Sequence, residues 1–149
     1  MVHRLFTCLL ALLAAVPTPL PAQSGFDVRF GVIKVDANSQ PHFVETQRVP
    51  NIEGQGYGWI VRDNIDRPIR WVERLTLPAA PASWGEAGHN STVVISKDRR
   101  TATTTVDVVP GNSPIMHFWG VAPGDPVGVY HIQLSIGGTD PVSFEFEVR

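Results

Sequence analysis

The chain has 149 residues, with 12 Lys and Arg against 14 Asp and Glu and a formal net charge of −2. Nucleic acids and anionic membranes are bound by clustered Lys and Arg, so this small, mixed charge gives no reason to expect a nucleic-acid partner. The only cysteine, Cys8, lies in an apolar N-terminal run, so the remaining residues can form neither a disulfide nor a thiolate metal site.

The first 24 residues have the pattern of a secretory signal peptide. A short basic start precedes the apolar residues 5–16 and a small, proline-rich stretch at 17–24. The apolar run is shorter than the roughly 20 residues that a membrane-spanning helix needs. We predict cleavage after Ser24, with cleavage after Ala22 as the alternative. The product would be a single domain of residues 25–149, periplasmic or secreted, without stable membrane insertion.

The first two predicted strands differ in clarity. Residues 26–35 alternate apolar and polar side chains, and the alternation changes phase at Gly31. A glycine at such a point predicts a bulge or a crossing from one sheet to the other. Residues 42–49 form a weaker extended run that Pro50 ends.

The third strand carries glycines on one side. Tyr57, Trp59 and Val61 share one face, and Gly56 and Gly58 leave the opposite face bare. Where glycine lines a strand, another backbone, an aromatic ring or a ligand can approach closely. This strand is therefore expected to have an unusually close neighbour.

Residues 69–77 predict a two-faced strand. The apolar face carries Ile69, Trp71, Leu75 and Leu77, and the opposite face carries Arg70, Val72, Arg74 and Thr76. A period of two places such sets on opposite sides of a pleated strand. Residues 78–88 have the composition of an irregular surface loop, which contains Trp84.

Further strands are expected at residues 90–96, 101–109 and 115–121, the first two joined by a charged hairpin tip. The last stretch, residues 127–149, has two alternating runs around a Gly-Gly-Thr-Asp-Pro turn, which predicts an antiparallel hairpin. No segment after residue 24 has the sustained 3.6-residue repeat of apolar side chains that is typical of a helix. The sequence thus predicts an all-β, antiparallel sandwich of about 7 to 9 strands without a disulfide.

Several short segments together resemble a bacterial family of small exported domains that has no assigned function. They are the Phe-Gly-Val at 30–32, the Thr-Gln-Arg-Val-Pro at 46–50, the Gly-Tyr-Gly at 56–58 and the Pro-Gly-Asp at 123–125. The similarity extends over residues 26–149. It implies an immunoglobulin-like β-sandwich and carries no catalytic residue to this chain. The paired cysteines of antibody domains are absent, so kinship with those domains is architectural.

No catalytic or metal-binding arrangement is visible. His42, His89, His117 and His131 lack the spacing by which two imidazoles on one element share an ion, so only tertiary structure could bring them together. A Gly-x-Ser-x-Gly motif is missing, and Ser83 lies in an ordinary polar loop. We therefore predict no catalytic residue, no metal and no cofactor, and a protein that is not an enzyme.

Binding is better supported than catalysis. Strand parity places Trp59, Trp71 and Trp119 in the core, whereas nothing in the loop implies burial of Trp84. The first hypothesis is an exported module that contacts another envelope or secreted protein through an edge strand or the long loops. The alternative is a small-ligand or glycan-binding domain. Its candidate binding residues are Tyr57, Arg70, Arg74 and Trp84.

Overall fold

The structure is a computed structural model that describes residues 25–85, 91–109, 111 and 114–149. The predicted signal peptide therefore lies outside the described residues. Within the described part, no helix is long and apolar enough to cross a bilayer. The described strands are β1 (Val28–Val35), β2 (Pro41–Glu45), β3 (Arg48–Val49), β4 (Gly56–Val61), β5 (Ile69–Thr76), β6 (Ser91–Ile95), β7 (Thr101–Val108), β8 (Met116–Gly120), β9 (Gly128–Ile136) and β10 (Val142–Val148).

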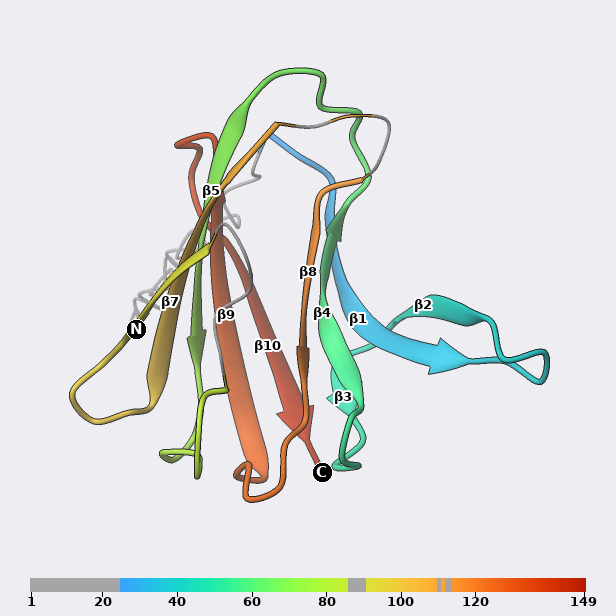
Figure 1. Cartoon of the computed structure of the whole chain (residues 1–149), viewed down its shortest axis with the longest axis vertical. Helices are drawn as coiled ribbons and strands as arrows, with labels where there is room; N and C mark the ends of the chain where they lie inside the picture. The colour runs from blue at the N-terminus through green and yellow to red at the C-terminus, as the bar shows by residue number, and fades with distance from the viewer. Residues whose placement is uncertain (1–24, 86–90, 110, 112–113) are drawn as a thin grey trace, which may run out of the picture.

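These strands form two sheets that face each other, as the sequence predicted. The four-stranded sheet has the order β2-β1-β4-β8, and the six-stranded sheet has the order β3-β10-β9-β5-β7-β6. In Figure 1, β1, β4 and β8 lie opposite β10, β9 and β5, whereas β2 leans away from the sandwich. The all-β class is confirmed, and the two sheets differ in width by two strands.

The predicted consequence of Gly31, a bulge or a crossing between sheets, is wrong. Strand β1 does not cross between sheets, because Gly31 pairs with Glu45 of β2 and with Gly58 of β4 inside the same sheet, and it has no bulge there, because both registers are one to one at Gly31. A Cβ at Gly31 would collide with the Val44 carbonyl of β2, so this glycine permits close pairing instead. The crossing comes later, where the expected run at 42–49 divides into β2 in one sheet and β3 in the other.

The C-terminal hairpin is confirmed. Strands β9 and β10 pair antiparallel in the register Phe144↔Ile132 and Phe146↔Tyr130. The turn between them contains Gly137 and Gly138 at φ of 60° and 75°, a region that residues with a Cβ rarely adopt. Strand β9 also pairs with β5, so the hairpin joins the centre of the wider sheet.

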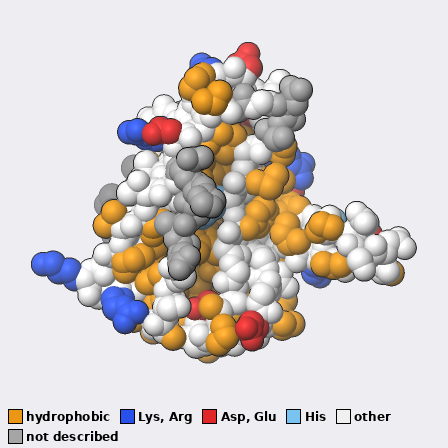
Figure 2. Space-filling view, in the orientation of Figure 1, with side chains coloured by type: hydrophobic (Ala, Val, Ile, Leu, Met, Phe, Trp, Pro, Cys, Tyr) orange, Lys and Arg blue, Asp and Glu red, His pale blue; other side chains and the backbone are white. Residues whose placement is uncertain are grey.

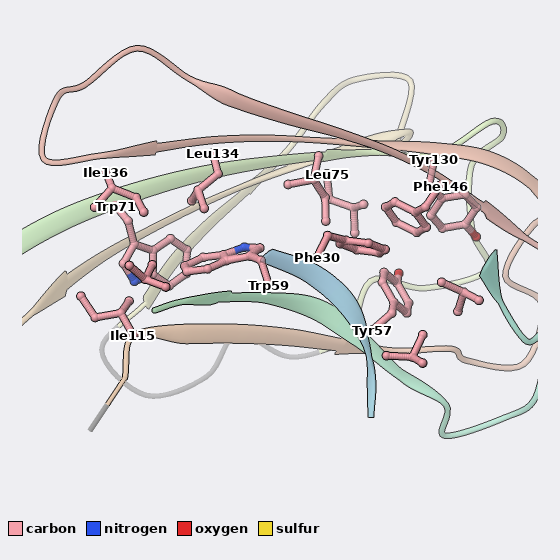
Figure 3. Packing of buried hydrophobic residues seen from close by; sticks show 14 of the residues in the cluster. Phe30, Tyr57, Trp59, Trp71, Leu75, Ile115, Tyr130, Leu134, Ile136 and Phe146 are labelled. Carbon is pink, nitrogen blue, oxygen red and sulfur yellow. The ribbon is translucent and has the colours of Figure 1, made fainter. Parts of the chain in front are cut away.

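The core lies between the two sheets. Trp59 of β4 and Trp71 of β5 are 0% and 3% exposed, which confirms that both belong to the core, and their rings meet edge to face at 5.1 Å. Figure 3 shows this pair at one end of the core and a second aromatic group at the other end. That group consists of Phe30, Tyr57, Tyr130 and Phe146. Each such buried ring contributes roughly 1.5 to 3 kcal/mol.

The two tyrosines of the chain are expected to resist ionisation while the protein is folded. Burial raises the pKa of Tyr57 and of Tyr130 well above the usual value of about 10. A group whose pKa is raised on folding contributes stability fully below its unfolded pKa, and this contribution is lost as the pH rises further. The free energy of unfolding should therefore fall above about pH 10. Tyrosinate absorbance should appear only together with loss of the circular-dichroism signal. Tyrosinate forming near pH 10 in a protein that is still folded would contradict this expectation.

Candidate functional site

A carboxyl group lies inside the core. Glu73 of β5 is 0% exposed and points, with Trp71 and Leu75, toward the four-stranded sheet. Its position follows from the alternation along β5, because residues 71, 73 and 75 share one face. An acidic residue in such a place is destabilising unless its oxygens find hydrogen-bond donors.

Three side chains supply those donors. The Trp59 indole nitrogen donates to Glu73 Oε2 at 2.5 Å, and the Trp119 indole nitrogen donates to Oε1 at 2.7 Å. His117 Nδ1 lies 3.2 Å from Oε2. An indole N–H can only donate, so both carboxyl oxygens act as acceptors. Glu73 thus binds β4 and β8 to β5 across the sandwich.

The same contacts orient the imidazole of His117. Because Glu73 Oε2 accepts from Trp59, Nδ1 of His117 is placed to donate to the same oxygen, and Nε2 makes no contact with Glu73. The His117 side chain is 26% exposed, whereas Glu73 is fully buried. The histidine therefore stands at the boundary between the core and an open space.

That space arises because the two sheets differ in width. Strand β8 is the last strand of the narrower sheet, and its contacts with Glu73 hold it over β5. The wider sheet continues past β5 with β7 and β6, so their inner faces extend beyond the edge of β8. Figure 2 shows apolar side chains on both sides of the position that β8 occupies in Figure 1.

A cavity of about 670 Å³ lies at this step between the sheets. Residues from both sheets and from the loop before β6 line it: Tyr57, Leu77, Pro81, Ser83, Trp84, Gly85, Ser91, Val93, Ile95, Thr104, His117, Phe118, Trp119, Gly120, Ala122 and Asp125. Apolar and aromatic side chains predominate among them, which is typical of a binding site with a few polar groups. We refer to this space as the edge cavity.

Two indole rings form part of the wall of the edge cavity. Trp84 and Trp119 meet edge to face, with ring centroids 5.9 Å apart. The Trp84 indole N–H donates to the Arg99 carbonyl at 2.9 Å, and the Trp119 indole N–H donates to the Glu73 carboxyl group. Since both N–H groups are satisfied within the protein, the rings offer the cavity only apolar contact.

Thr104 adds a polar group to this wall. It is 2% exposed, and among the described residues its hydroxyl oxygen has no hydrogen-bond partner. Thr104 pairs with Glu73 of β5 on one side and with Val93 of β6 on the other. A buried hydroxyl usually has a hydrogen-bond partner, and this one lies in the lining of the edge cavity.

The four predicted binding residues do not form one site. Tyr57 and Trp84 both line the edge cavity, although Tyr57 is only 3% exposed. Arg70 and Arg74 point to the outer face of the wider sheet, away from the cavity. Arg70 binds Asp107 through two hydrogen bonds of 2.8 Å, and this pairing lowers the pKa of Asp107.

Glu73 and Thr104 were missed by the sequence reasoning. The pattern that could have found Glu73 is the alternation of β5, where an acidic residue occupies an apolar position between Trp71 and Leu75. The predicted core position of Trp119 is partly correct, since this residue lies half-buried at the core margin. Among the described residues, no three His, Cys, Asp or Glu side chains gather as metal ligands. His89 lies outside the described residues.

Comparison with known proteins identifies the family. Residues 28–149 match the PM0630 beta sandwich domain. The chain belongs to that family. The resemblance to a bacterial immunoglobulin-like family is thereby confirmed.

A solved structure supports the fold of this PM0630 domain. The chain is similar to an immunoglobulin-like protein from Pseudomonas aeruginosa, with 17% sequence identity and a TM-score of 0.54. The match covers 86% of this chain and 98% of that protein. At this identity the likeness shows the fold alone. No curated protein matches the chain. The immunoglobulin-like sandwich is typical of non-enzymatic domains, but function depends on the site that a fold carries.

Proposed function

We propose that this PM0630 domain is an exported, non-enzymatic binding module that contacts another envelope or secreted protein by accepting one of its strands at the β8 edge. The observation that carries the proposal is the step between the sheets. Strand β8 ends the narrower sheet over β5, while β7 and β6 continue beneath the open space. An added strand would extend the narrower sheet over β7 and place alternate side chains in the edge cavity.

The backbone of β8 is arranged for such pairing. Val61 of β4 donates to the Ile115 carbonyl, and Val121 donates to the Gln55 carbonyl. Backbone groups of successive residues point to opposite edges of an antiparallel strand, so His117 and Trp119 also bond toward β4. The alternate residues, which are Met116, Phe118 and Gly120, then direct their N–H and C=O groups to the outer edge.

The sequence of strand β8 lacks the residues that usually protect an edge. Its sequence, Met-His-Phe-Trp-Gly, contains no Lys and no Pro, the residues that commonly keep exposed edges from pairing. Strand β6, the corresponding edge of the wider sheet, is the uncharged Ser-Thr-Val-Val-Ile. Two uncharged edges beside an apolar cavity are suited to an extended polypeptide.

The small-ligand or glycan alternative retains one specific argument. The Trp84 and Trp119 rings at 5.9 Å could contact the face of a sugar or another ring. Arg70 and Arg74 would not take part, because they lie on the outer face of the wider sheet. The alternative then rests on these two rings and on the polar residues of the cavity lining, among them Ser83, Thr104 and Asp125.

Substituting Gly120 tests strand addition with a matched pair of variants. Gly120→Pro removes an N–H that points outward, whereas Gly120→Ala keeps it, and a Cβ at this position meets no atom within 4 Å. Envelope proteins retained by the immobilised wild type should also be retained by Gly120→Ala. We expect Gly120→Pro to reduce their retention by about tenfold or more, equivalent to one or two lost hydrogen bonds.

Two outcomes would count against this function. Equal retention by Gly120→Pro and wild type would show that the β8 edge is not used. Repeated absence of any retained envelope protein would oppose a protein partner altogether. Saturable quenching of tryptophan fluorescence by an oligosaccharide, lost in Trp84→Ala, would favour the glycan alternative instead.

A further inference from the structure

The β6 and β7 residues that face the edge cavity form its floor. Each pair of residues opposite one another on the two strands is called a row here. The β6–β7 register pairs Ile95 with Ala102 and Val93 with Thr104. Residues two apart on one strand are separated by about 6.6 Å, which is also the spacing of inward side chains on any added strand. Neighbouring side chains of an added strand that face the cavity would therefore lie over neighbouring rows.

The row of Thr104 is polar, unlike its neighbour. The Thr104 hydroxyl is buried without a partner among the described residues, and His117, which lines the same cavity, has its Nδ1 bound to Glu73. The hydroxyl can donate and accept, and Nε2 accepts in the tautomer whose Nδ1 donates to Glu73. An amide or hydroxyl over this row, which both donates and accepts, can bond to the two groups in either orientation of the Thr104 hydroxyl.

The row of Ile95 is apolar and lies next to the hairpin between β6 and β7. Leu77 and Trp84, which line the cavity, are bound to this hairpin through the Arg100 and Arg99 carbonyls. An apolar side chain over this row would pack against Ile95, Leu77 and Trp84. It would fill the space that the narrower sheet leaves uncovered.

The hairpin itself is positively charged. Lys97, Arg99 and Arg100 are exposed there, and Asp98 is the acidic residue among them. The Asp98 carboxylate already accepts from the Ser96 hydroxyl and the Arg100 backbone. Figure 2 shows Lys and Arg side chains projecting where Figure 1 places this hairpin. A partner segment that continues past the Ile95 row would meet this positive charge.

Resting on the proposed strand addition, we infer that the partner segment carries three features in register. A neutral hydrogen-bonding residue (Ser, Thr, Asn or Gln) lies over Thr104, an apolar residue two positions away lies over Ile95, and an acidic residue follows next to the hairpin. Thr104 selects the central residue, and the cations of the hairpin attract the acidic one.

A charged residue fits the central position poorly. A carboxylate there would lie over Thr104, whose β5 neighbour in the pairing is the buried Glu73 carboxyl group. A Lys or Arg over Thr104 would face Glu73, whose two oxygens already accept from the Trp59 and Trp119 indoles. Burial of an unpaired charge is far more costly than burial of a satisfied amide or hydroxyl.

Selection from a library of random linear peptides displayed on phage tests this inference. Peptides selected on the immobilised wild-type protein should show Ser, Thr, Asn or Gln two positions from an apolar residue, with Asp or Glu beyond the latter. On Thr104→Val, which has nearly the same shape without the hydroxyl, the central preference should change to apolar residues. Peptides selected on the wild-type protein should bind Thr104→Val about tenfold more weakly, and their affinity should be restored in Thr104→Ser.

The outcomes separate this inference from the function on which it rests. One outcome is that the peptides lose binding to Gly120→Pro, while selection on Thr104→Val still returns Ser, Thr, Asn or Gln at the central position. This outcome would overturn the inference and leave strand addition supported. Peptides that bind Gly120→Pro as well as wild type, or a failure to select any, would overturn both. Binding should weaken as salt is raised, and salt-independent binding would refute the acidic residue.

Discussion

Replacing Glu73 with leucine is expected to lower the free energy of unfolding by about 3 kcal/mol or more. The change removes the acceptor of two indole N–H groups and of the His117 Nδ1. Trp59 is fully buried, so water cannot replace the lost acceptor there. Trp119 and His117 are half-buried at the cavity, and water can serve them in part. Urea unfolding followed by tryptophan fluorescence measures the loss.

The matched control for this experiment is Glu145→Leu. Glu145 is an exposed glutamate on β10, 3.6 Å from His131, and surface substitutions of this kind change stability by about 0.5 kcal/mol or less. Glu73→Gln should fall between the two, because the amide keeps one acceptor oxygen and presents an N–H group to donors. A loss below about 1 kcal/mol in Glu73→Leu would mean that the carboxyl group does not hold the sheets together.

Substituting Gly58 by alanine is expected to be similarly disruptive, with a loss of about 3 kcal/mol or a failure to fold. A Cβ at Gly58 would collide with the His117 carbonyl and would lie 2.8 Å from the Phe118 Cα, both backbone atoms of β8. Backbone atoms cannot move aside as a flexible side chain can. The strand β8 would have to separate from β4, which would also withdraw His117 and Trp119 from Glu73.

Gly56→Ala is the control from the same strand. A Cβ there would meet only the Ile33 side chain at 3.5 Å, an ordinary van der Waals distance. We expect this variant to lose less than about 1 kcal/mol, chiefly through small packing changes. Hydrogen exchange of the β8 amides should rise sharply in Gly58→Ala and stay unchanged in Gly56→Ala. Equal behaviour of the two variants would refute the close approach of β8.

The strands themselves could be predicted because their patterns are local. The hairpin of β9 and β10 follows from two alternating runs and a glycine turn, and both appear where expected. The bare face of β4 was also correctly predicted to lie against a close neighbour, which at Gly58 is the backbone of β8. The glycines alone could not identify that neighbour, because β4 and β8 are far apart in the sequence.

The pairing of sheets was beyond local patterns. The run at 42–49 appeared continuous, yet its two parts join different sheets as β2 and β3. Arg70 and Arg74 were grouped with Trp84 because all three are conspicuous binding residues. The structure separates them, since β5 turns its arginines outward and its Glu73 inward. A site on this sandwich depends on which strands become neighbours, and alternation does not specify that.

By itself, the sequence determined the fold class, the C-terminal hairpin and the core tryptophans, Trp59 and Trp71, because a period of two sorts side chains by face within each strand. Only the tertiary structure decided that Glu73 meets Trp119 and His117 across the sandwich, and that β8 ends over β5. Those relations join residues about 45 positions apart, and they depend on strand order and sheet width. The edge cavity is therefore a product of topology, and its lining could be read only after the sheets were assembled.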